Sequence, residues 1–281
     1  MNPGRHWRLR TRSLSLEKPL IMGVINVTPD SFSDGGSFTS SHDAVAQGRR
    51  LIEQGADLLD LGGESTRPGA EPIPATTEIR RVIPVLEGLR GTVPISVDTT
   101  KPEVARLALE AGAEVINDVT GGSDPDMLEV VAAAGAGLIL MHMQGLPPTM
   151  QDDPRYEDVV EDIKVFLTVQ SLAARKAGVQ EDGIAIDPGI GFGKTLEHNL
   201  EIIREIGSFR SLGFPVLLGA SRKKFLGTIT GVDQPSQRDL ASAVVTALAV
   251  ERGADIFRVH NVSACREAVA VALAIVRGSG G

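Results

Sequence analysis

The sequence predicts a single (β/α)8 TIM barrel, and three observations support this fold class. Eight short apolar segments recur along the 281 residues, each followed by a helix-like segment. All eight end in polar residues, as expected when reacting groups gather at the carboxyl ends of barrel strands. A Gly-Ala pair ends a predicted helix and enters the next strand four times, at Gly55, Gly112, Gly135 and Gly253. A doubly wound open sheet would concentrate its polar groups near one switch point, so the barrel is favoured.

The predicted strands are short apolar runs, which are typical of buried parallel strands. They cover residues 20–26, 57–61, 93–98, 114–117, 137–142, 183–187, 214–219 and 255–260. Between them, apolar residues at helical spacing predict the outer layer of the barrel. The expected helices cover residues 41–54, 75–90, 102–111, 125–134, 155–177, 195–206, 236–252 and 261–277. Pro102 stands just inside a first turn, where its missing N–H costs nothing.

The chain divides into an N-terminal extension of residues 1–19, a barrel of residues 20–277 and a flexible tail of residues 278–281. Weak alternation of Trp7, Leu9, Leu14 and Leu16 predicts a small hairpin in the extension. The basic N-terminus lacks the apolar segment of a signal peptide, and the apolar stretches are too short for a membrane span. We therefore expect a cytoplasmic protein.

The charge balance restricts the partners. With 28 basic and 36 acidic residues the net charge is −8, which argues against binding to nucleic acid or an anionic membrane. An anionic substrate would need a local basic pocket. The single cysteine, Cys265, excludes an internal disulfide and is expected in the core.

The glycine-rich segment 187–195 (Asp-Pro-Gly-Ile-Gly-Phe-Gly-Lys-Thr) superficially resembles a nucleotide-binding loop. A phosphate loop has four residues between its first Gly and the Gly-Lys pair, whereas Gly189 and Gly193 have three between them. We interpret Asp187 as a carboxylate at a strand end, with glycines that let a flat ligand approach the backbone. The alternative is that Asp187 only caps a turn.

A basic cluster follows the seventh and eighth strands. Ser221-Arg-Lys lies after the seventh, where such barrels often hold an anion, and Arg258 and His260 end the eighth. Asn261 and Ser263 open the next helix, whose N-terminal amides add to the attraction. Taken alone, Ser221-Arg-Lys could be a solvated charged loop, but together these residues favour an anion site.

Asp98 and Asn117 end adjacent strands and place a carboxylate beside an amide. This pair suits recognition of an amidine-like edge, and a catalytic acid–base pair is the other option. His142 between two methionines fits core packing, and no second histidine stands at metal-ligand spacing. Glu64 is expected to stabilise its loop, and the proline-rich segment 144–154 is typical of a mobile lid.

Eight motifs stand at these strand ends. They begin at Asn26 (Asn-Val-Thr-Pro-Asp-Ser-Phe-Ser-Asp-Gly-Gly), Asp60 (Asp-Leu-Gly-Gly-Glu-Ser-Thr-Arg-Pro-Gly), Ser96 (Ser-Val-Asp), Ile116 (Ile-Asn-Asp), Met141 (Met-His-Met-Gln-Gly), Asp187 (Asp-Pro-Gly-Ile-Gly-Phe-Gly-Lys), Ser221 (Ser-Arg-Lys) and Arg258 (Arg-Val-His). Together they resemble the bacterial dihydropteroate synthases, a pterin-binding family. The resemblance covers about residues 20–277, and its first two motifs are highly specific.

The resemblance implies a folate-pathway transferase that joins 4-aminobenzoate to 6-hydroxymethyl-7,8-dihydropterin diphosphate and releases pyrophosphate. It implies Mg²⁺ at Asn26, a homodimer and sensitivity of the family to sulfonamides. The implied catalytic residues are Asp98, Lys223, Arg258 and His260. The implied substrate-binding residues are these four with Asn26, Asp60, Thr66, Arg67, Asn117, Met141, Asp187, Phe192 and Ser221. Loops 28–36 and 62–70 would close over 4-aminobenzoate, after the diphosphate has bound.

The chemistry suits an ionising, SN1-like displacement. The aryl amine is neutral at pH 7 and needs no strong base, so the protein must stabilise a leaving diphosphate and a pterin cation. Asp98 is the expected partner of that cation.

Three other functions compete with this one. A pterin-binding methyltransferase shares the barrel but has no use for the basic cluster. A catalytically silent paralogue would be expected to lose loop residues. A Schiff-base aldolase would use Lys223, but a lysine between Arg222 and Lys224 is not the buried amine that such chemistry prefers.

Overall fold

The predicted barrel is confirmed by a computed structural model that describes residues 5–28, 37–65 and 69–277. Its eight parallel strands are β3 (Leu20–Asn26), β4 (Leu58–Gly62), β5 (Ile95–Asp98), β6 (Val115–Asp118), β7 (Gly137–Met141), β8 (Ile184–Asp187), β9 (Leu217–Leu218) and β10 (Ile256–Val259). They pair in the order β8-β7-β6-β5-β4-β3-β10-β9. A further parallel bridge between Ile186 and Val216 joins the two ends, which closes the barrel.

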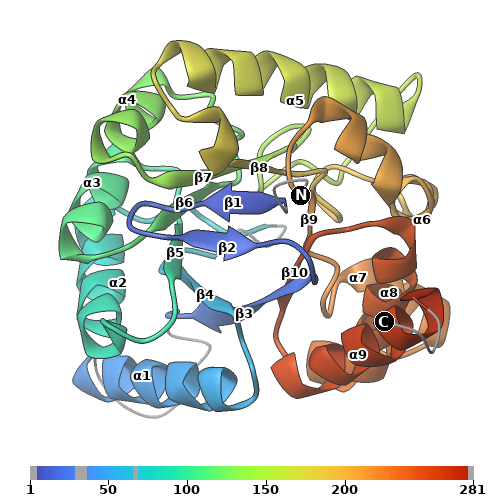
Figure 1. The fold of residues 1–281 in the computed structure, drawn as a ribbon, viewed down its shortest axis with the longest axis horizontal. Coiled ribbons are helices and arrows are strands. Elements are labelled where there is room, and N and C mark those ends of the chain that lie inside the picture. The colour runs from blue at the N-terminus through green and yellow to red at the C-terminus, as the bar shows by residue number, and fades with distance from the viewer. Residues whose placement is uncertain (1–4, 29–36, 66–68, 278–281) are drawn as a thin grey trace.

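Helices surround the strands on all sides (Figure 1). They are α1 (Ser37–Glu53), α2 (Ala75–Leu89), α3 (Pro102–Ala111), α4 (Pro125–Ala134), α5 (Val159–Lys176), α6 (Leu196–Arg204), α7 (Lys224–Thr230), α8 (Asp239–Arg252) and α9 (Val262–Arg277). Short 3-10 turns add Glu181–Gly183, Ile206–Leu212 and Pro235–Gln237. Of these, α7 and the 3-10 turns were not among the expected elements. No helix in the described ranges is long and apolar enough to cross a membrane.

Two predicted strands begin late because each contains a proline near its start. Pro94 and Pro215 have no N–H for the ladder, although their carbonyls still accept from Leu59 N at 3.0 Å and from Ile186 N at 2.9 Å. The expected long helix at 155–177 also starts later, because the carboxylate of Asp158 caps it by accepting from the next turn.

The Gly-Ala pairs end helices as predicted. Gly112 and Gly253 have φ of 113° and 97°, in the left-handed region that favours glycine, and their N–H groups close the last turns of α3 and α8. The chain then enters the next strand at once, so the amino-terminal face of the barrel has short connections.

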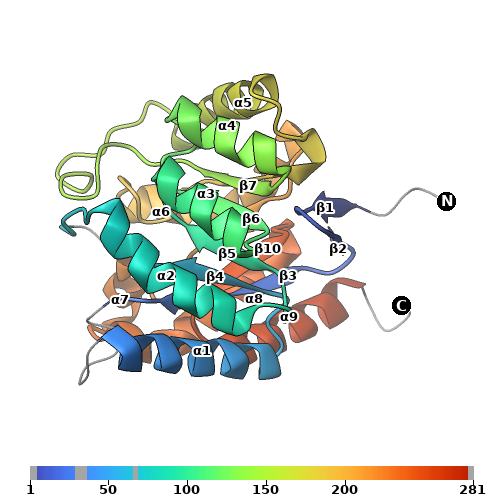
Figure 2. The same cartoon turned by 90° about the vertical axis from the view of Figure 1, so that its left-hand side faces the viewer.

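An antiparallel hairpin of β1 (His6–Arg8) and β2 (Ser13–Ser15) covers this amino-terminal face, which confirms the expected hairpin. Figure 2 shows it at the opposite end from the long loops. Trp7 is fully buried and donates from Nε1 to the carbonyl of Gly183 at 3.0 Å. Asp255 accepts from Arg5, and Glu114 accepts from Arg12. With this end filled by side chains, the opposite mouth is left for a ligand.

Candidate active site

A row of residues crosses the carboxyl ends of four neighbouring strands. The register pairs Asn26 with Gly62, Gly62 with Asp98, and Asp98 with Asn117. A Cβ added at Gly62 would lie 3.7 Å from Oδ1 of Asn26 and 3.9 Å from Cβ of Asp98. Glycine at this position therefore leaves the space between the amide and the carboxylate open.

Arg258 joins this row from the other side of the mouth. Its Nε lies 2.6 Å from Oδ2 of Asp60, and its Nη2 lies 3.0 Å from Oδ2 of Asp98. Nδ2 of Asn117 donates to the same Asp60 oxygen at 3.2 Å. The sequence placed Arg258 at an anion site with His260, whereas the structure shows it held by two carboxylates, so a bound diphosphate would share or replace these partners.

The two carboxylates keep unused acceptors. Oδ1 of Asp60 and Oδ1 of Asp98 are buried and have no hydrogen-bond partner among the described residues. Burial raises the pKa of Asp98 to about 7; the guanidinium of Arg258 counteracts this shift, and the charge of Asp60 adds to it.

Asp187 ends β8 and is oriented by its own loop. Its Oδ1 accepts from Gly189 N at 2.7 Å, while a Cβ at Gly219 would lie 3.6 Å from Oδ2 and 4.0 Å from Cβ of Arg258. Burial raises the pKa of Asp187 to about 6, although the Gly189 N–H and the charges of Lys223 and Arg258 lower it. The side chain does take part in a turn, as the alternative held, and it also lies at the mouth beside Arg258.

An apolar wall stands beside these groups. Val119, Met141, Met150 and Phe192 form a separate buried cluster, against which Met143 packs. Nζ of Lys223 lies 3.9 Å from the centroid of the Phe192 ring. A flat heteroaromatic ligand with a polar edge fits such a surface, because the wall can cover its face while the carboxylates meet its edge.

Ser221 and His260 lie next to each other at the ends of β9 and β10. Ser221 Oγ lies 3.0 Å from Nδ1 of His260 and accepts from its backbone N–H at 3.2 Å. The structure therefore brings together the expected residues of both strands. Thr66 and Arg67 lie outside the described residues, as do residues 29–36 of the first loop and 66–68 of the second.

Lys194 was missed as a site residue. It is 3% exposed, and its Nζ contacts Nδ1 of His142 at 3.0 Å and donates to the carbonyl of Phe192 at 3.0 Å. Burial lowers the pKa of Lys194 to about 7, and burial followed by the charge of Lys194 lowers that of His142 to about 3. A lysine that ends a glycine-rich loop after a strand-end aspartate was the available signal. Neutral His142 also contacts the ring of Phe166 edge-on at 4.9 Å, consistent with the expected packing role.

Glu64 stabilises its loop as predicted. Its two oxygens accept from Ile73 N at 2.6 Å and from Lys101 Nζ at 2.8 Å. Lys101 also donates to Glu78, which is fully buried in α2, at 2.7 Å. From the sequence, Lys101 is expected only at the start of the helix that follows it.

The proline-rich segment 144–154 is closed at its base by Gln144, whose side chain donates to the carbonyl of Arg155 and accepts from its N–H. Met150 is buried in the apolar wall, and Gln151 donates to the carbonyl of Gly191 at 2.5 Å. The segment is thus attached to the loop that carries Phe192, a placement suited to a lid; its motion stays a prediction.

The described residues fit a metal only in part. They contain no group of three His, Cys, Asp or Glu side chains that could hold an ion. Asn26 presents an amide oxygen at the mouth, and Mg²⁺ often takes one or two protein ligands together with substrate phosphates and water. With Asn26 as a single protein ligand, a Mg²⁺ here would need a phosphorylated ligand and water to supply its other ligands.

Comparisons with known proteins agree with this geometry. The family of pterin binding enzymes matches residues 22–260. The dihydropteroate synthase of Escherichia coli K12 is 44% identical over 261 residues, 92% of each chain. The Xanthomonas albilineans dihydropteroate synthase solved with 4-aminobenzoic acid is 46% identical with a TM-score of 0.91, covering 97% of this chain and 98% of that one. The same enzyme in complex with 7,8-dihydropteroate gives 43% identity and a TM-score of 0.87, covering 96% and 98%.

Proposed function

The chain belongs to the dihydropteroate synthases of the pterin-binding enzyme family, and we propose that it condenses 6-hydroxymethyl-7,8-dihydropterin diphosphate with 4-aminobenzoate, releasing pyrophosphate. The observation that carries this proposal is the convergence of Asp98, Asn117, Asp187 and Arg258 at one barrel mouth. Relatives that have been solved with 4-aminobenzoic acid and with 7,8-dihydropteroate support the choice of substrate and product.

The pterin would lie with its amidine-like edge toward Asp187, beside Met141, while Phe192 on the same apolar wall would face 4-aminobenzoate. Oδ1 of Asp187 is held by Gly189 N, so the carboxylate has a fixed orientation in which it can accept N–H bonds from the edge of a pterin. Asn117 and Lys223 would complete the pocket. Asp60 fixes the orientation of Arg258 and Asn117 by accepting from both side chains.

The reaction would proceed by departure of the diphosphate before the amine attacks. The bond between the pterin methylene carbon and the diphosphate oxygen breaks, and its electron pair leaves with pyrophosphate. The amine nitrogen of 4-aminobenzoate then forms the new C–N bond and loses a proton. Asp98 would stabilise the transient cation with its unpartnered Oδ1, and Arg258 and His260 would stabilise the developing negative charge.

Mg²⁺ is the proposed metal, with Asn26 as its protein ligand. When bound, it would neutralise part of the charge on the diphosphate. The donors supplied by this chain would remain Arg258 and His260. The test is calorimetric: chelation of Mg²⁺ should weaken binding of the diphosphate substrate and leave binding of a phosphate-free pterin unchanged.

Thr66, Arg67 and Ser221 are the proposed contacts of 4-aminobenzoate, and sulfonamides would compete at the same position. The first two residues lie outside the described ranges, so this assignment is supported by the sequence motif alone. Binding of 4-aminobenzoate should require that the pterin and pyrophosphate positions are filled.

We also propose a cytoplasmic homodimer that uses the outer face of α8. Leu240, Val244 and Leu248 lie one helical turn apart and are 78%, 51% and 43% exposed. A stripe of this kind is typical of a helix that packs against a partner. Sedimentation velocity should show a dimer for the wild type and a monomer for Val244→Glu; a monomeric wild type would contradict the proposal.

The proposed function is tested by product identity. Mass spectrometry should detect dihydropteroate only when both substrates are present. A methyltransferase would instead transfer a methyl group from a methylated pterin, and a silent paralogue would bind a pterin without turnover. The basic residues at the ends of β9 and β10 favour the synthase over the methyltransferase, and the complete loop motifs favour it over the silent paralogue.

A further inference from the structure

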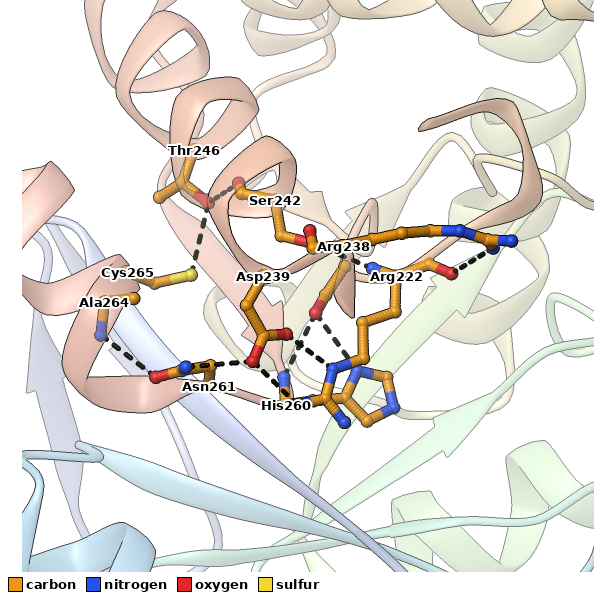
Figure 3. A network of polar contacts seen from close by, with 10 residues as sticks. Arg222, Arg238, Asp239, Ser242, Thr246, His260, Asn261, Ala264 and Cys265 are labelled. Atoms are coloured by element: carbon orange, nitrogen blue, oxygen red, sulfur yellow. Dashed lines mark hydrogen bonds and ion pairs between the residues drawn. The ribbon is translucent and has the colours of Figure 1, made fainter. Parts of the chain in front are cut away.

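Two loops that carry proposed site residues meet at the start of one outer helix. The first follows β9 and contains Ser221 to Lys223, and the second follows β10 and contains His260 and Asn261. Asp239, the first residue of α8, contacts both of them (Figure 3).

The carboxylate of Asp239 has three charged or polar donors. Nε of Arg222 donates to Oδ1 at 2.6 Å and Nη2 of Arg222 to Oδ2 at 2.9 Å. Nδ2 of Asn261 donates to Oδ2 at 2.9 Å. The paired contacts with Arg222 have the two-pronged geometry that fixes orientation as well as distance. A single side chain thus ties the two loops together.

The backbone at Arg222 shows how closely the first loop is held. Its φ is 59°, which makes it the one non-glycine residue with a left-handed backbone in the described part of the chain. Its N–H donates to Ser242 Oγ at 3.0 Å, and its carbonyl accepts from Nη1 of Arg238 at 3.0 Å. Two more residues near the start of α8 therefore maintain a conformation that an L-residue adopts at a cost.

With this backbone conformation, the side chain of Arg222 points in a different direction from those of Ser221 and Lys223. Its guanidinium faces Asp239, whereas Ser221 contacts His260 and Lys223 lies over the ring of Phe192. Arg222 is therefore an anchor of its loop, although the sequence grouped it with the residues that attract an anion.

We propose that Asp239 is a positioning residue for the reaction. It holds Arg222 in one loop and Asn261 in the other at the same time. It thereby sets the position of Ser221 and Lys223 relative to His260. The pterin pocket and the diphosphate site are in this way kept in register. Asp239 itself touches neither substrate. The inference rests on the proposed synthase function.

Asp239→Asn tests it. The amide keeps the size of the side chain but loses the charge, and its NH₂ group would face a donor. We expect kcat/KM to fall by about tenfold, which corresponds to about 1.4 kcal/mol, with KM raised for both substrates. Asp239→Glu keeps the charge and should recover part of the loss. Asp126→Asn, which makes the same change in the first turn of α4, is the matched control for helix stability.

Arg222→Gly breaks the same contact without changing any residue of α8. Glycine accepts the left-handed backbone, so the fold should be retained while the link to Asp239 is lost. The same rise in both KM values is expected, with a Tm within about 2 °C of the wild type. This arm keeps the test valid if Asp239→Asn folds poorly.

The possible results distinguish failure of the positioning role of Asp239 from failure of the proposed synthase function. An active wild type with unchanged KM values in Asp239→Asn and Arg222→Gly would overturn the positioning role alone. A fall in kcat without any change in KM would indicate a smaller fraction of folded enzyme, and would also overturn it. A wild type that makes no dihydropteroate would overturn the proposed function and, with it, this inference.

Discussion

Nε of Arg258 lies 2.6 Å from Oδ2 of Asp60, although the two residues are 198 positions apart in the chain. Asp60 is fully buried, and the same guanidinium reaches Asp98. Arg258 therefore serves as the shared counter-charge of two buried carboxylates, which matters because an unpaired buried charge is costly. Function requires that this balance can be shifted when an anionic substrate enters.

Arg258→Ala should lower kcat/KM for the diphosphate substrate by at least about tenfold, because each charge-assisted bond contributes roughly 1.5–3 kcal/mol. Binding of a phosphate-free pterin should weaken much less, as calorimetry can show. Arg258→Lys should recover only part of the loss, since an ammonium cannot reach both carboxylates as a planar fork does.

The control is Arg106→Ala, which breaks a surface pair with Glu110 on α3. This variant should keep wild-type kinetics. Equal weakening of both ligands by Arg258→Ala would make Arg258 a structural residue and would favour the methyltransferase or the silent paralogue.

Asp187→Asn should abolish measurable pterin binding while the fold is retained. The amide oxygen can still accept from Gly189 N, so Nδ2 takes the place of Oδ2 and presents a donor to the N–H edge of the ligand. An unmatched buried polar group costs about 1–3 kcal/mol. Calorimetric titration with a pterin measures the loss, with exposed Asp182→Asn as the control. Unchanged affinity would remove Asp187 from the pocket.

Asp98→Asn should flatten the dependence of stability on pH. The folded pKa of Asp98 is about 7 and its ordinary value is 3.8, so the folded state binds the extra proton between these values. The wild type should therefore lose stability relative to the variant as pH rises from about 4 to 7. Urea unfolding at several pH values measures this difference, and parallel curves for the two proteins would contradict it.

Lys194→Met should produce the opposite trend. Burial lowers the folded pKa of Lys194 to about 7 from its ordinary value of 10.5, so the unfolded state binds the extra proton between these values. Relative to the variant, the wild type should gain stability as pH rises from about 7 to 10. Thermal unfolding across this range tests it; a wild-type gain no larger than that of the variant would show that Lys194 is not desolvated.

Sequence patterns predicted the barrel and most of the proposed site because both depend on local signals. An apolar run that ends in Asp98, Asn117 or Asp187 identifies both a strand and the polar residue at its carboxyl end. The pairing of Arg258 with Asp60 could not be predicted this way, since it depends on how strands far apart in sequence face each other.

The missed residues follow the same rule. Lys194 and Asp239 contact distant loops. The glycine-rich loop before Lys194 marks its position but not its partner His142, and an isolated aspartate such as Asp239 gives no sign of either. The seventh strand was predicted too long because its apolar content suggested pairing that Pro215 cannot complete.

The most direct test of the central claim is the release of pyrophosphate by the purified protein with Mg²⁺. We predict one pyrophosphate for each dihydropteroate formed, only when the pterin diphosphate and 4-aminobenzoate are both present, and a rate at least about tenfold lower in Arg258→Ala. No release with both substrates, or release without any dihydropteroate, would contradict the assignment of this barrel mouth as a synthase site.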